Sequence, residues 1–288
     1  MSARAITPDL LFKMWQRMVS SENWVIRPYT PGHHINRPNQ ARIWRAGGRL
    51  LRALWACYTI AFWCLLRFDE VLRIQVEDLE VQSPTVIVLT LRWRKTDQYG
   101  GMHWYFPSHF FPHALLGIKP FVLHYLPEEQ AYLCPVRAIA EWIAASEIKT
   151  GYLFRKLTSD RVYTHDAPMV CNIQLFLDYN LPLIVWQTSQ YFLEHFRNQL
   201  LDVNIDPLPY GTHSFRRGGC QWLYTGCRWD LRRICDWGGW STEFDNLTIV
   251  KYILSWNDDP REDRQDFLNP NKKPTVMCNI CGRSCPCS

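Results

Sequence analysis

The sequence has no hydrophobic run long enough to cross a membrane. Its most apolar stretch, residues 53 to 66, holds about 14 residues between Arg52 and Arg67, whereas a membrane-spanning helix needs roughly 18 to 20. This absence argues against a membrane-spanning function, and we expect no membrane partner. We expect the stretch to form a buried helix instead.

An apolar signal core is also missing, because Arg4, Thr7, Pro8 and Asp9 interrupt the N-terminus. The 11 cysteines of the chain would indicate disulfides in a secreted protein, but without a leader we expect reduced thiols. The expected location is the nucleus if the protein is eukaryotic, and otherwise the cytoplasm.

A strong charge imbalance is lacking as well. The 288 residues carry a formal net charge of +5, and 47% of them are hydrophobic. This composition is typical of a globular protein with a substantial core, and the mildly basic balance permits a polyanionic partner without requiring one. We expect one folded domain over residues 1–260, with an irregular loop at 25–40.

The tail after residue 260 is polar and ends in four cysteines, at positions 278, 281, 285 and 287. Structural zinc sites usually draw their ligands from two separated pairs. We therefore expect a disordered tail at 261–288 and no metal, with zinc binding as the alternative.

Local signals predict a mixed α/β chain that is mainly α-helical with a small antiparallel β-sheet. Capping residues and apolar periodicity predict helices that begin near Thr7, Leu50, Pro135, Thr188, His213 and Asp230, a helix that carries Tyr252, and a short helix at 170–179. The β-branched run at 85–93 predicts a strand, and residues 102–106 predict the strand that returns beside it. Lys95 would then lie near the tip of a hairpin.

Arginines recur at helical intervals just before the buried stretch, at Arg42, Arg45, Arg49 and Arg52. Residues three and four apart share one helix face. The stripe therefore faces either DNA phosphates or solvent, and the sequence favours neither.

The segment from Thr212 to Gly219 organises the remaining motifs. It places His213 and Arg216 three residues apart at a predicted helix start, so that imidazole and guanidinium can converge on one anion beside backbone N–H groups. Alone, such a pair is a weak signal, because it also occurs by chance on protein surfaces.

Together with Trp240 and Tyr252, this segment resembles the C-terminal half of the tyrosine recombinases, the phage integrase family. Arg67-Phe68-Asp69-Glu70, after the buried helix, is similar to the surroundings of that family's first catalytic arginine. Arg94-Lys95-Thr96-Asp97-Gln98 is similar to its lysine-bearing hairpin. The resemblance covers about residues 5–258, looks like that of eukaryotic mobile elements, and implies the recombinase catalytic-domain fold.

The resemblance implies that DNA strands are broken and rejoined through a 3′-phosphotyrosine. The catalytic residues it implies are Arg67, Lys95, His213, Arg216, Trp240 and Tyr252, with Glu70 orienting Arg67 or His213. Site-specific recombination or integration would be the biological outcome.

The residue types fit this chemistry. Attack of a phenol on a phosphodiester gathers negative charge on the nonbridging oxygens, which paired arginines stabilise. A phenol with a pKa of about 10 must lose its proton, and the leaving 5′-oxygen must gain one. Lys95 suits the acid and His213 the base. No carboxylate pair at metal-chelating spacing accompanies the set, so we expect no cofactor and disfavour a two-metal nuclease.

The expected partner is double-stranded DNA, with self-association of the protein on it. The residues predicted to bind DNA are Arg42, Arg45, Arg49, Arg52, Arg92, Arg94, Arg217, Arg228, Arg232 and Arg233. Two rival functions remain open at this stage: a module that holds DNA without cutting it, and an enzyme similar to type IB topoisomerases.

Overall fold

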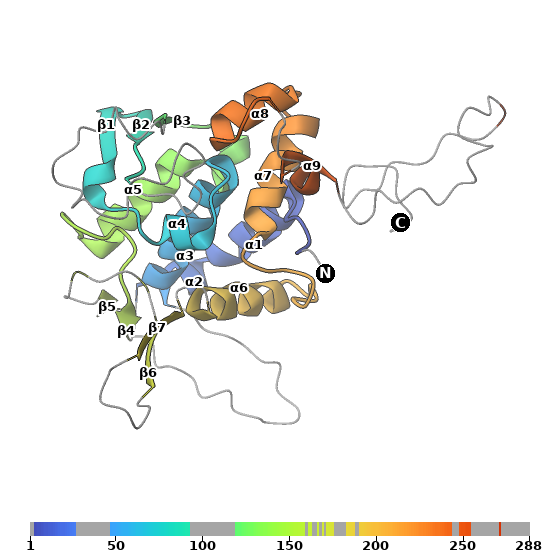
Figure 1. Cartoon of the computed structure of the whole chain (residues 1–288). Helices are drawn as coiled ribbons and strands as arrows, with labels where there is room; N and C mark the ends of the chain where they lie inside the picture. The colour runs from blue at the N-terminus through green and yellow to red at the C-terminus, as the bar shows by residue number, and fades with distance from the viewer. Residues whose placement is uncertain are drawn as a thin grey trace.

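The computed structural model describes residues 3–26, 47–92, 119–158, 161–162, 166, 169, 171–175, 183–187, 190–243, 248–254 and 271. Among these residues the chain is mainly helical, with a three-stranded antiparallel sheet and two two-stranded ribbons. Figure 1 shows the sheet at one side of the helices and the ribbon of β6 and β7 at their lower end. The predicted fold class is confirmed at this level.

The described helices are α1 (Pro8–Met18), α2 (Ser21–Trp24), α3 (Gly48–Trp63), α4 (Phe68–Val71), α5 (Pro135–Ser146), α6 (Gln190–Asp202), α7 (Ser214–Thr225), α8 (Leu231–Gly238) and α9 (Thr248–Ile253), with 3-10 turns at Val76–Asp78 and Glu128–Leu133. The strands are β1 (Leu79–Ser83), β2 (Val86–Leu89), β3 (Phe121–His124), β4 (Leu157–Thr158), β5 (Arg161–Val162), β6 (Cys171–Leu175) and β7 (Leu183–Gln187).

Helix α3 is the core of the molecule (Figure 1). All of its residues except Arg49, Arg52 and Trp63 are buried, because α5 and α7 both pack against it. A helix that is covered on more than one side needs no polar face. The sequence therefore reads there as a nearly unbroken apolar run, and the predicted buried helix is confirmed.

Helix α7 approaches its neighbours closely through a glycine pair. A Cβ atom on Gly218 would lie 2.1 Å from the carbonyl oxygen of Ile6, and one on Gly219 would lie 2.0 Å from that of Phe62. Only glycine fits where a backbone comes this close. The pair therefore sets the position of the residues that precede it, Arg216 and Arg217.

Local capping signals located several helices correctly. The Thr7 hydroxyl accepts a hydrogen bond from the N–H of Leu10, at 3.2 Å, at the start of α1. The carboxylate of Asp230 caps α8 through the N–H of Arg233, at 2.8 Å. His213 is the residue before α7, and Gly226 follows its last residue. These features confirm the predicted starts of α1, α7 and α8.

Two predictions about strands were wrong or incomplete. Residues 171–175, predicted as part of a short helix, form β6 and pair in antiparallel register with β7, the next strand along the chain, because strand pairing overrides weak local preference. The strand that returns beside β2 is β3, whereas the predicted return strand at 102–106 lies outside the described residues.

Parts of the predicted domain plan also lie outside the described residues: most of the loop at 25–40, the hairpin tip near Lys95, and the tail at 261–288 apart from Asn271. Within the described part of the chain, no helix is both long and apolar enough to cross a membrane.

Candidate functional site

Arg216 is the centre of the site. Its Nε donates a hydrogen bond to the carbonyl oxygen of Leu65 at 2.6 Å, and its Nη2 donates to Oε2 of Glu70 at 2.5 Å. The Arg216 side chain is 2% exposed and that of Glu70 is fully buried. Burial of a charge is costly unless it is paired and hydrogen-bonded. The pair therefore fixes the start of α7 against the chain between α3 and α4.

The segment between α3 and α4 is shaped to present the carbonyl oxygen of Leu65. Leu65 has a φ of +53°, in the left-handed region that a residue with a side chain seldom adopts. Its side chain is fully buried, and its carbonyl oxygen points at Arg216. The strained turn is thus held by packing and by the guanidinium, as is common at functional sites.

Glu70 joins the two arginines that the sequence predicted. The same Oε2 atom that binds Arg216 accepts a hydrogen bond from the backbone N–H of Arg67 at 2.7 Å. Arg67 is the residue before α4, and its side chain is half-buried. Glu70 therefore contacts the backbone of Arg67 and the side chain of Arg216, while its role in orienting Arg67 or His213 stays a prediction.

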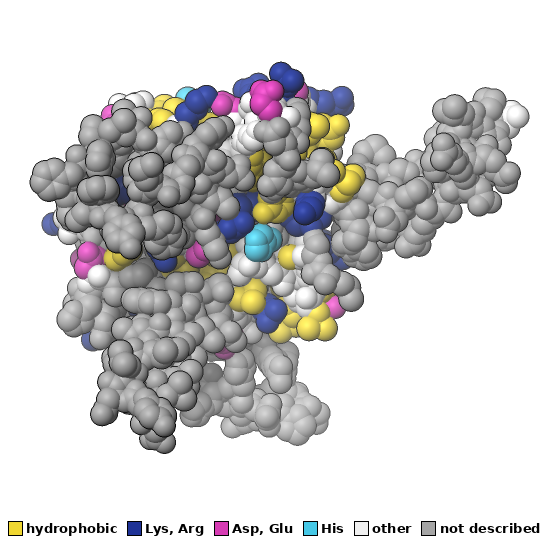
Figure 2. All heavy atoms as spheres, viewed as in Figure 1, with side chains coloured by type: hydrophobic (Ala, Val, Ile, Leu, Met, Phe, Trp, Pro, Cys, Tyr) yellow, Lys and Arg dark blue, Asp and Glu magenta, His cyan; other side chains and the backbone are white. Residues whose placement is uncertain are grey.

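His213 lies in the electric field of both guanidinium groups. Burial lowers the pKa of its imidazole, and Arg216 and Arg67 lower that pKa further, while Asp69 and Glu70 act in the opposite direction. The ring is therefore neutral at pH 7 and able to accept a proton. Figure 2 shows Lys and Arg side chains gathered around a histidine in the middle of the face that α4 and α7 present.

Tyr252 and Trp240, which follow His213 and Arg216 in the sequence, complete the site. Their rings stack with centroids 5.4 Å apart and planes inclined by 24°. The Cζ atom of Arg216 lies 5.8 Å from the Tyr252 ring centroid and 5.9 Å from that of Trp240. The structure thus brings together five of the six predicted catalytic residues, Arg67, His213, Arg216, Trp240 and Tyr252.

The sixth predicted catalytic residue, Lys95, lies outside the described residues. The predicted DNA-binding residues Arg42, Arg45 and Arg94 lie there too.

Three other predicted DNA-binding arginines have partners within the protein. Arg49 Nε donates to the carbonyl oxygen of Ala145 at 2.7 Å. Arg52 pairs with Glu141 at 3.2 Å and stacks on the Trp24 ring at 3.9 Å. Arg92 pairs with the buried Asp78 at 2.6 Å. Arg49, Arg52 and Arg92 therefore have structural roles that do not require DNA.

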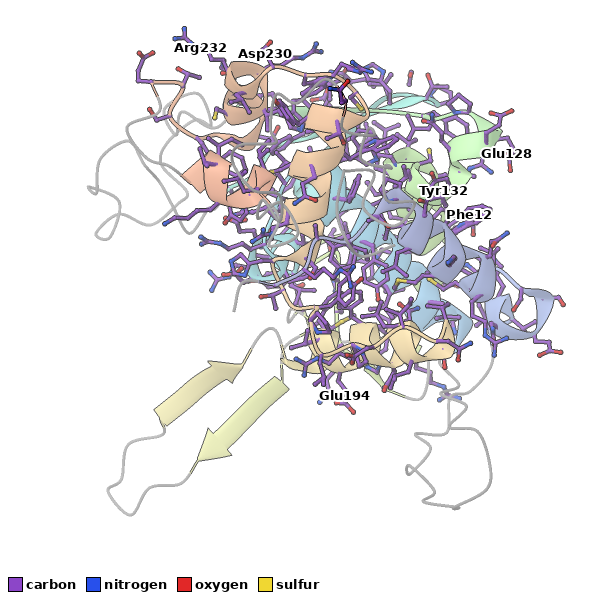
Figure 3. The ribbon with its side chains drawn as sticks, turned by 90° about the vertical axis from the view of Figure 1, so that its right-hand side faces the viewer. Phe12, Glu128, Tyr132, Glu194, Asp230 and Arg232 are labelled. Carbon is purple, nitrogen blue, oxygen red and sulfur yellow. The ribbon has the colours of Figure 1, made fainter. Side chains whose placement is uncertain are left out.

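The predicted DNA-binding arginines near α8 are exposed. Arg228, Arg232 and Arg233 all lie at the surface, and the guanidinium of Arg233 lies 4.1 Å from the centroid of the Trp229 ring. Figure 3 shows Arg232 and Asp230 at the outer end of the molecule, where side chains point into solvent.

Sequence reasoning assigned Arg217 to DNA, but its side chain is 7% exposed. Its Nη2 donates to the carbonyl oxygen of Leu254 at 2.6 Å, and Nε2 of the nearby Gln221 donates to the carbonyl oxygen of Tyr252 at 3.3 Å. Both acceptors belong to α9 or to the residue just after it. No signal in the sequence singled out Gln221.

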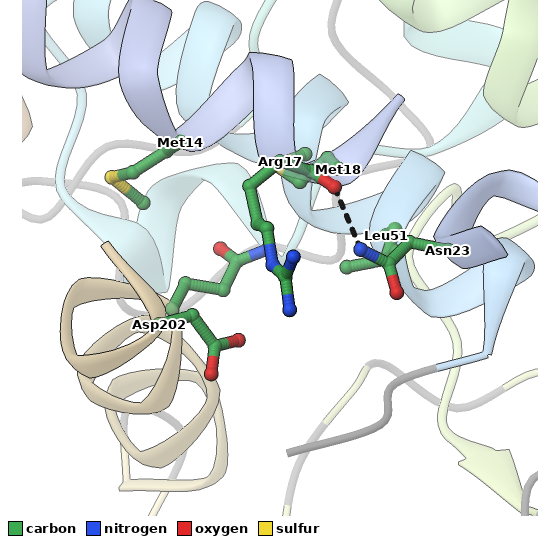
Figure 4. Close-up of a pocket in the computed structure, with 7 residues that line it drawn as sticks. Met14, Arg17, Met18, Asn23, Leu51 and Asp202 are labelled. Atoms are coloured by element: carbon green, nitrogen blue, oxygen red, sulfur yellow. Dashed lines mark hydrogen bonds between the residues drawn. The ribbon is translucent and has the colours of Figure 1, made fainter. Parts of the chain in front are cut away.

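A small pocket lies apart from this site, between α1 and α6 (Figure 4). Its lining residues are Met14, Arg17, Met18, Asn23, Leu51, Gln199 and Asp202. Burial raises the pKa of Asp202 to about 6, against an opposing effect of Arg17. Nδ2 of Asn23 donates to the carbonyl oxygen of Arg17 at 2.8 Å. None of the predicted catalytic residues lines the pocket.

Fold and site together define a mainly helical protein with a small antiparallel sheet, in which Arg216 pairs with the buried Glu70 and lies beside the Tyr252 ring. No family model matches the chain, and no curated protein matches it. Among solved structures, it is similar to the XerH site-specific recombinase bound to palindromic difH substrate in a post-cleavage complex, with a TM-score of 0.45 and 11% identity. The match covers 91% of this chain and 50% of that one, so this chain spans half the length of the recombinase.

Proposed function

We propose that this protein breaks and rejoins DNA strands through a covalent bond between Tyr252 and a DNA phosphate. The observation that carries the proposal is the position of Arg216, whose guanidinium pairs with the Glu70 carboxylate at 2.5 Å and has its Cζ atom 5.8 Å from the centroid of the Tyr252 ring. A phenol beside a fixed cation is the arrangement that attack on a phosphodiester requires.

In the proposed step, the Tyr252 oxygen attacks the scissile phosphorus. A bond forms between the phenol oxygen and phosphorus, the bond from phosphorus to the 5′-oxygen breaks, and the DNA 3′-phosphate stays on the protein. The phenol proton leaves to a base, and the 5′-oxygen takes a proton from an acid. Rejoining is the reverse, with attack by a 5′-hydroxyl, so the exchange needs no net energy input.

Arg67 and Arg216 are the groups that we assign to the nonbridging oxygens of the phosphate. Guanidinium groups bind such oxygens in pairs, and a preorganised cation is worth most where charge develops in the transition state. His213 is assigned to accept or share the phenol proton, which its lowered pKa allows because the ring is neutral at pH 7. Lys95 remains our candidate for the acid on the 5′-oxygen.

Double-stranded DNA is the proposed substrate, with site-specific recombination or integration as the outcome and with self-association of the protein on DNA. Arg228, Arg232 and Arg233 are exposed and are our candidates for phosphate contacts outside the site, because arginines at the surface release condensed counterions when they meet DNA. In a eukaryote such a protein would act in the nucleus.

A second function, DNA binding without cleavage, is favoured by one observation. The Arg216 side chain is 2% exposed and already has two acceptors, Leu65 and Glu70, and a structural ion pair would look the same. Cleavage requires that a phosphate reach this guanidinium. Covalent attachment to DNA separates the two functions, and pairing of two DNA sites separates a recombinase from a type IB topoisomerase.

The test uses a pool of nicked duplex oligonucleotides of randomised sequence, so that no target site need be known. The nick lets the short 5′-hydroxyl fragment diffuse away, which traps the phosphotyrosine. We expect a protein–DNA adduct that survives denaturing electrophoresis and forms in the presence of EDTA. Binding to the pool without any adduct would reject cleavage and support the binding module.

A further inference from the structure

Helix α9, which carries Tyr252, has few apolar anchors of its own. It spans six residues, Thr248–Ile253, a length at which an isolated helix is unstable in water. Ile249 and Ile253 are buried and Tyr252 is half-buried, whereas Val250, Lys251 and Leu254 are exposed. Its position therefore depends on contacts with the rest of the protein, including the Trp240 ring and α7.

Two polar side chains of α7 bind the backbone at the C-terminal end of α9. Arg217 donates to the carbonyl oxygen of Leu254 at 2.6 Å, and Gln221 donates to that of Tyr252 at 3.3 Å. The last carbonyl groups of a helix have no partner within it, and a cation there also meets the negative end of the helix dipole. Arg217 and Gln221 are four residues apart and so lie on one face of α7.

We propose that Arg217 and Gln221 are positioning residues that hold α9, so that the Tyr252 oxygen is aligned for attack. This rests on the proposed cleavage function. Arg216 and Arg217 then have different roles: Arg216 faces Glu70 and the proposed phosphate position, while Arg217 binds α9. Misplacement of a nucleophile by about 1 Å can cost about 100-fold in rate, so a loosened α9 would slow the reaction without weakening DNA binding.

The alternative role for Arg217 is a direct contact with a DNA phosphate, and the two roles predict different measurements. A phosphate contact contributes to affinity and changes the salt dependence of binding, by about 0.9 in the slope of log K against log salt. A contact with α9 leaves both unchanged. A side chain that is 7% exposed and already donates to a carbonyl oxygen favours the contact with α9.

The experiment compares Arg217→Ala, Arg217→Lys and Gln221→Met with the wild type. A matched control is Arg161→Ala, which removes an exposed arginine of β5, on the opposite side of the molecule from α9 (Figure 1). For Arg217→Ala at saturating nicked duplex, we expect adduct formation to slow by about 100-fold. The rate of adduct formation by Arg217→Lys should be within about 10-fold of the wild-type rate, because an ammonium can also donate to a carbonyl oxygen.

Two further measurements do not depend on cleavage. Affinity for a random-sequence duplex should change by less than about twofold in Arg217→Ala, with an unchanged salt slope. Amide hydrogen exchange in residues 248–254 should speed up by at least about 10-fold while exchange in α3 stays unchanged, because local opening is independent of the core. Gln221→Met should show the same pattern more weakly, and Arg161→Ala none of it.

Reduced affinity with a lower salt slope would assign Arg217 to DNA and overturn the proposal. Unchanged exchange in 248–254 together with unchanged adduct formation would also overturn it. If the wild type attaches to no DNA, the proposed function is wrong, and the exchange measurement alone decides whether Arg217 holds α9.

Discussion

Arg67 and Arg216 contact Glu70 through different atoms, so substitution of each arginine has a different effect on stability. Arg216 contacts the carboxylate through its side chain, whereas Arg67 contacts it through its backbone N–H. Removal of one partner of a buried ion pair costs about 3–5 kcal/mol, so Arg216→Ala would lower stability as well as activity. The Arg67 contact survives replacement of its side chain.

We therefore predict that Arg67→Ala slows single-turnover cleavage by at least about 100-fold, the usual loss when a transition-state charge partner is removed. Its free energy of unfolding should change by about 1 kcal/mol or less. Rapid-quench kinetics on nicked duplex and urea denaturation measure the two quantities. A cleavage rate equal to that of the wild type would remove Arg67 from the site.

Adjacent arginines show what the sequence could and could not predict at this scale. The spacing of His213 and Arg216, and their resemblance to a known motif, indicated that both face one site. Arg216 and Arg217 are alike in composition, but consecutive residues of a helix point about 100° apart. The sequence did not reveal that Arg217 would meet α9, because that depends on where a helix more than 30 residues later docks.

Helix α7 carries the site because its glycine pair lets it lie against α3 and the N-terminal segment. We predict that Gly218→Ala and Gly219→Ala each destabilise the protein by about 3 kcal/mol or more, since the added Cβ would meet backbone oxygens at 2.1 and 2.0 Å. Urea denaturation measures the loss.

Gly211→Ala is the matched control, because its Cβ would meet only the Ala3 side chain at 3.6 Å, an ordinary contact. Its stability should stay within about 0.5 kcal/mol of the wild type. If all three variants were equally stable, α7 would not be packed as described.

Helices were predictable from local signals, whereas most strands were not. The caps at Thr7 and Asp230 and the proline at position 135 act within one turn of the helices they begin. Strands β3 and β6 have four and five residues. The partner of β3 is β2, far from it in the sequence, and the partner of β6 is β7, the next strand along the chain. Short segments of this kind carry too little local preference to be recognised before their partners are known.

At the scale of the whole molecule, the site lies where two apolar clusters meet. The main core contains Leu66 and Phe215, and the smaller cluster contains Leu65, Cys220 and Trp240, with Tyr252 packed against it. The consecutive residues Leu65 and Leu66 thus belong to different clusters, and so do Phe215 and Cys220 of α7. The segments that form this junction are far apart in the sequence, so the site residues come from distant parts of the chain.

Two titratable groups of α6, the buried His195 and the half-buried Asp202, should make stability depend on pH in opposite directions. Burial lowers the pKa of His195 from 6.5 to about 4 and raises that of Asp202 from 3.8 to about 6. Between these pH values the unfolded state therefore binds more protons at His195 than the folded state does. The contribution of His195 to the free energy of unfolding is lost as the pH falls from 6.5 towards 4. The contribution of Asp202 to the free energy of unfolding is present at low pH and is lost as the pH rises through 6.

We predict that His195→Gln removes the loss on acidification, so that its stability relative to the wild type rises by about 3 kcal/mol between pH 7 and pH 4. Asp202→Asn should change in the opposite sense and lose more stability than the wild type over the same range. Urea denaturation at both pH values measures these differences. Parallel pH profiles for all three proteins would contradict the assignment.

Tyr252 is the proposed nucleophile, and a variant that lacks only its phenol oxygen tests this role. Tyr252→Phe keeps the ring that stacks on Trp240 at 5.4 Å, so the fold and DNA affinity should stay close to those of the wild type. With labelled nicked duplex on a denaturing gel, we expect an adduct for the wild type, mapped to Tyr252 by mass spectrometry of the digested protein, and none for the variant. An adduct that persists in Tyr252→Phe would contradict it.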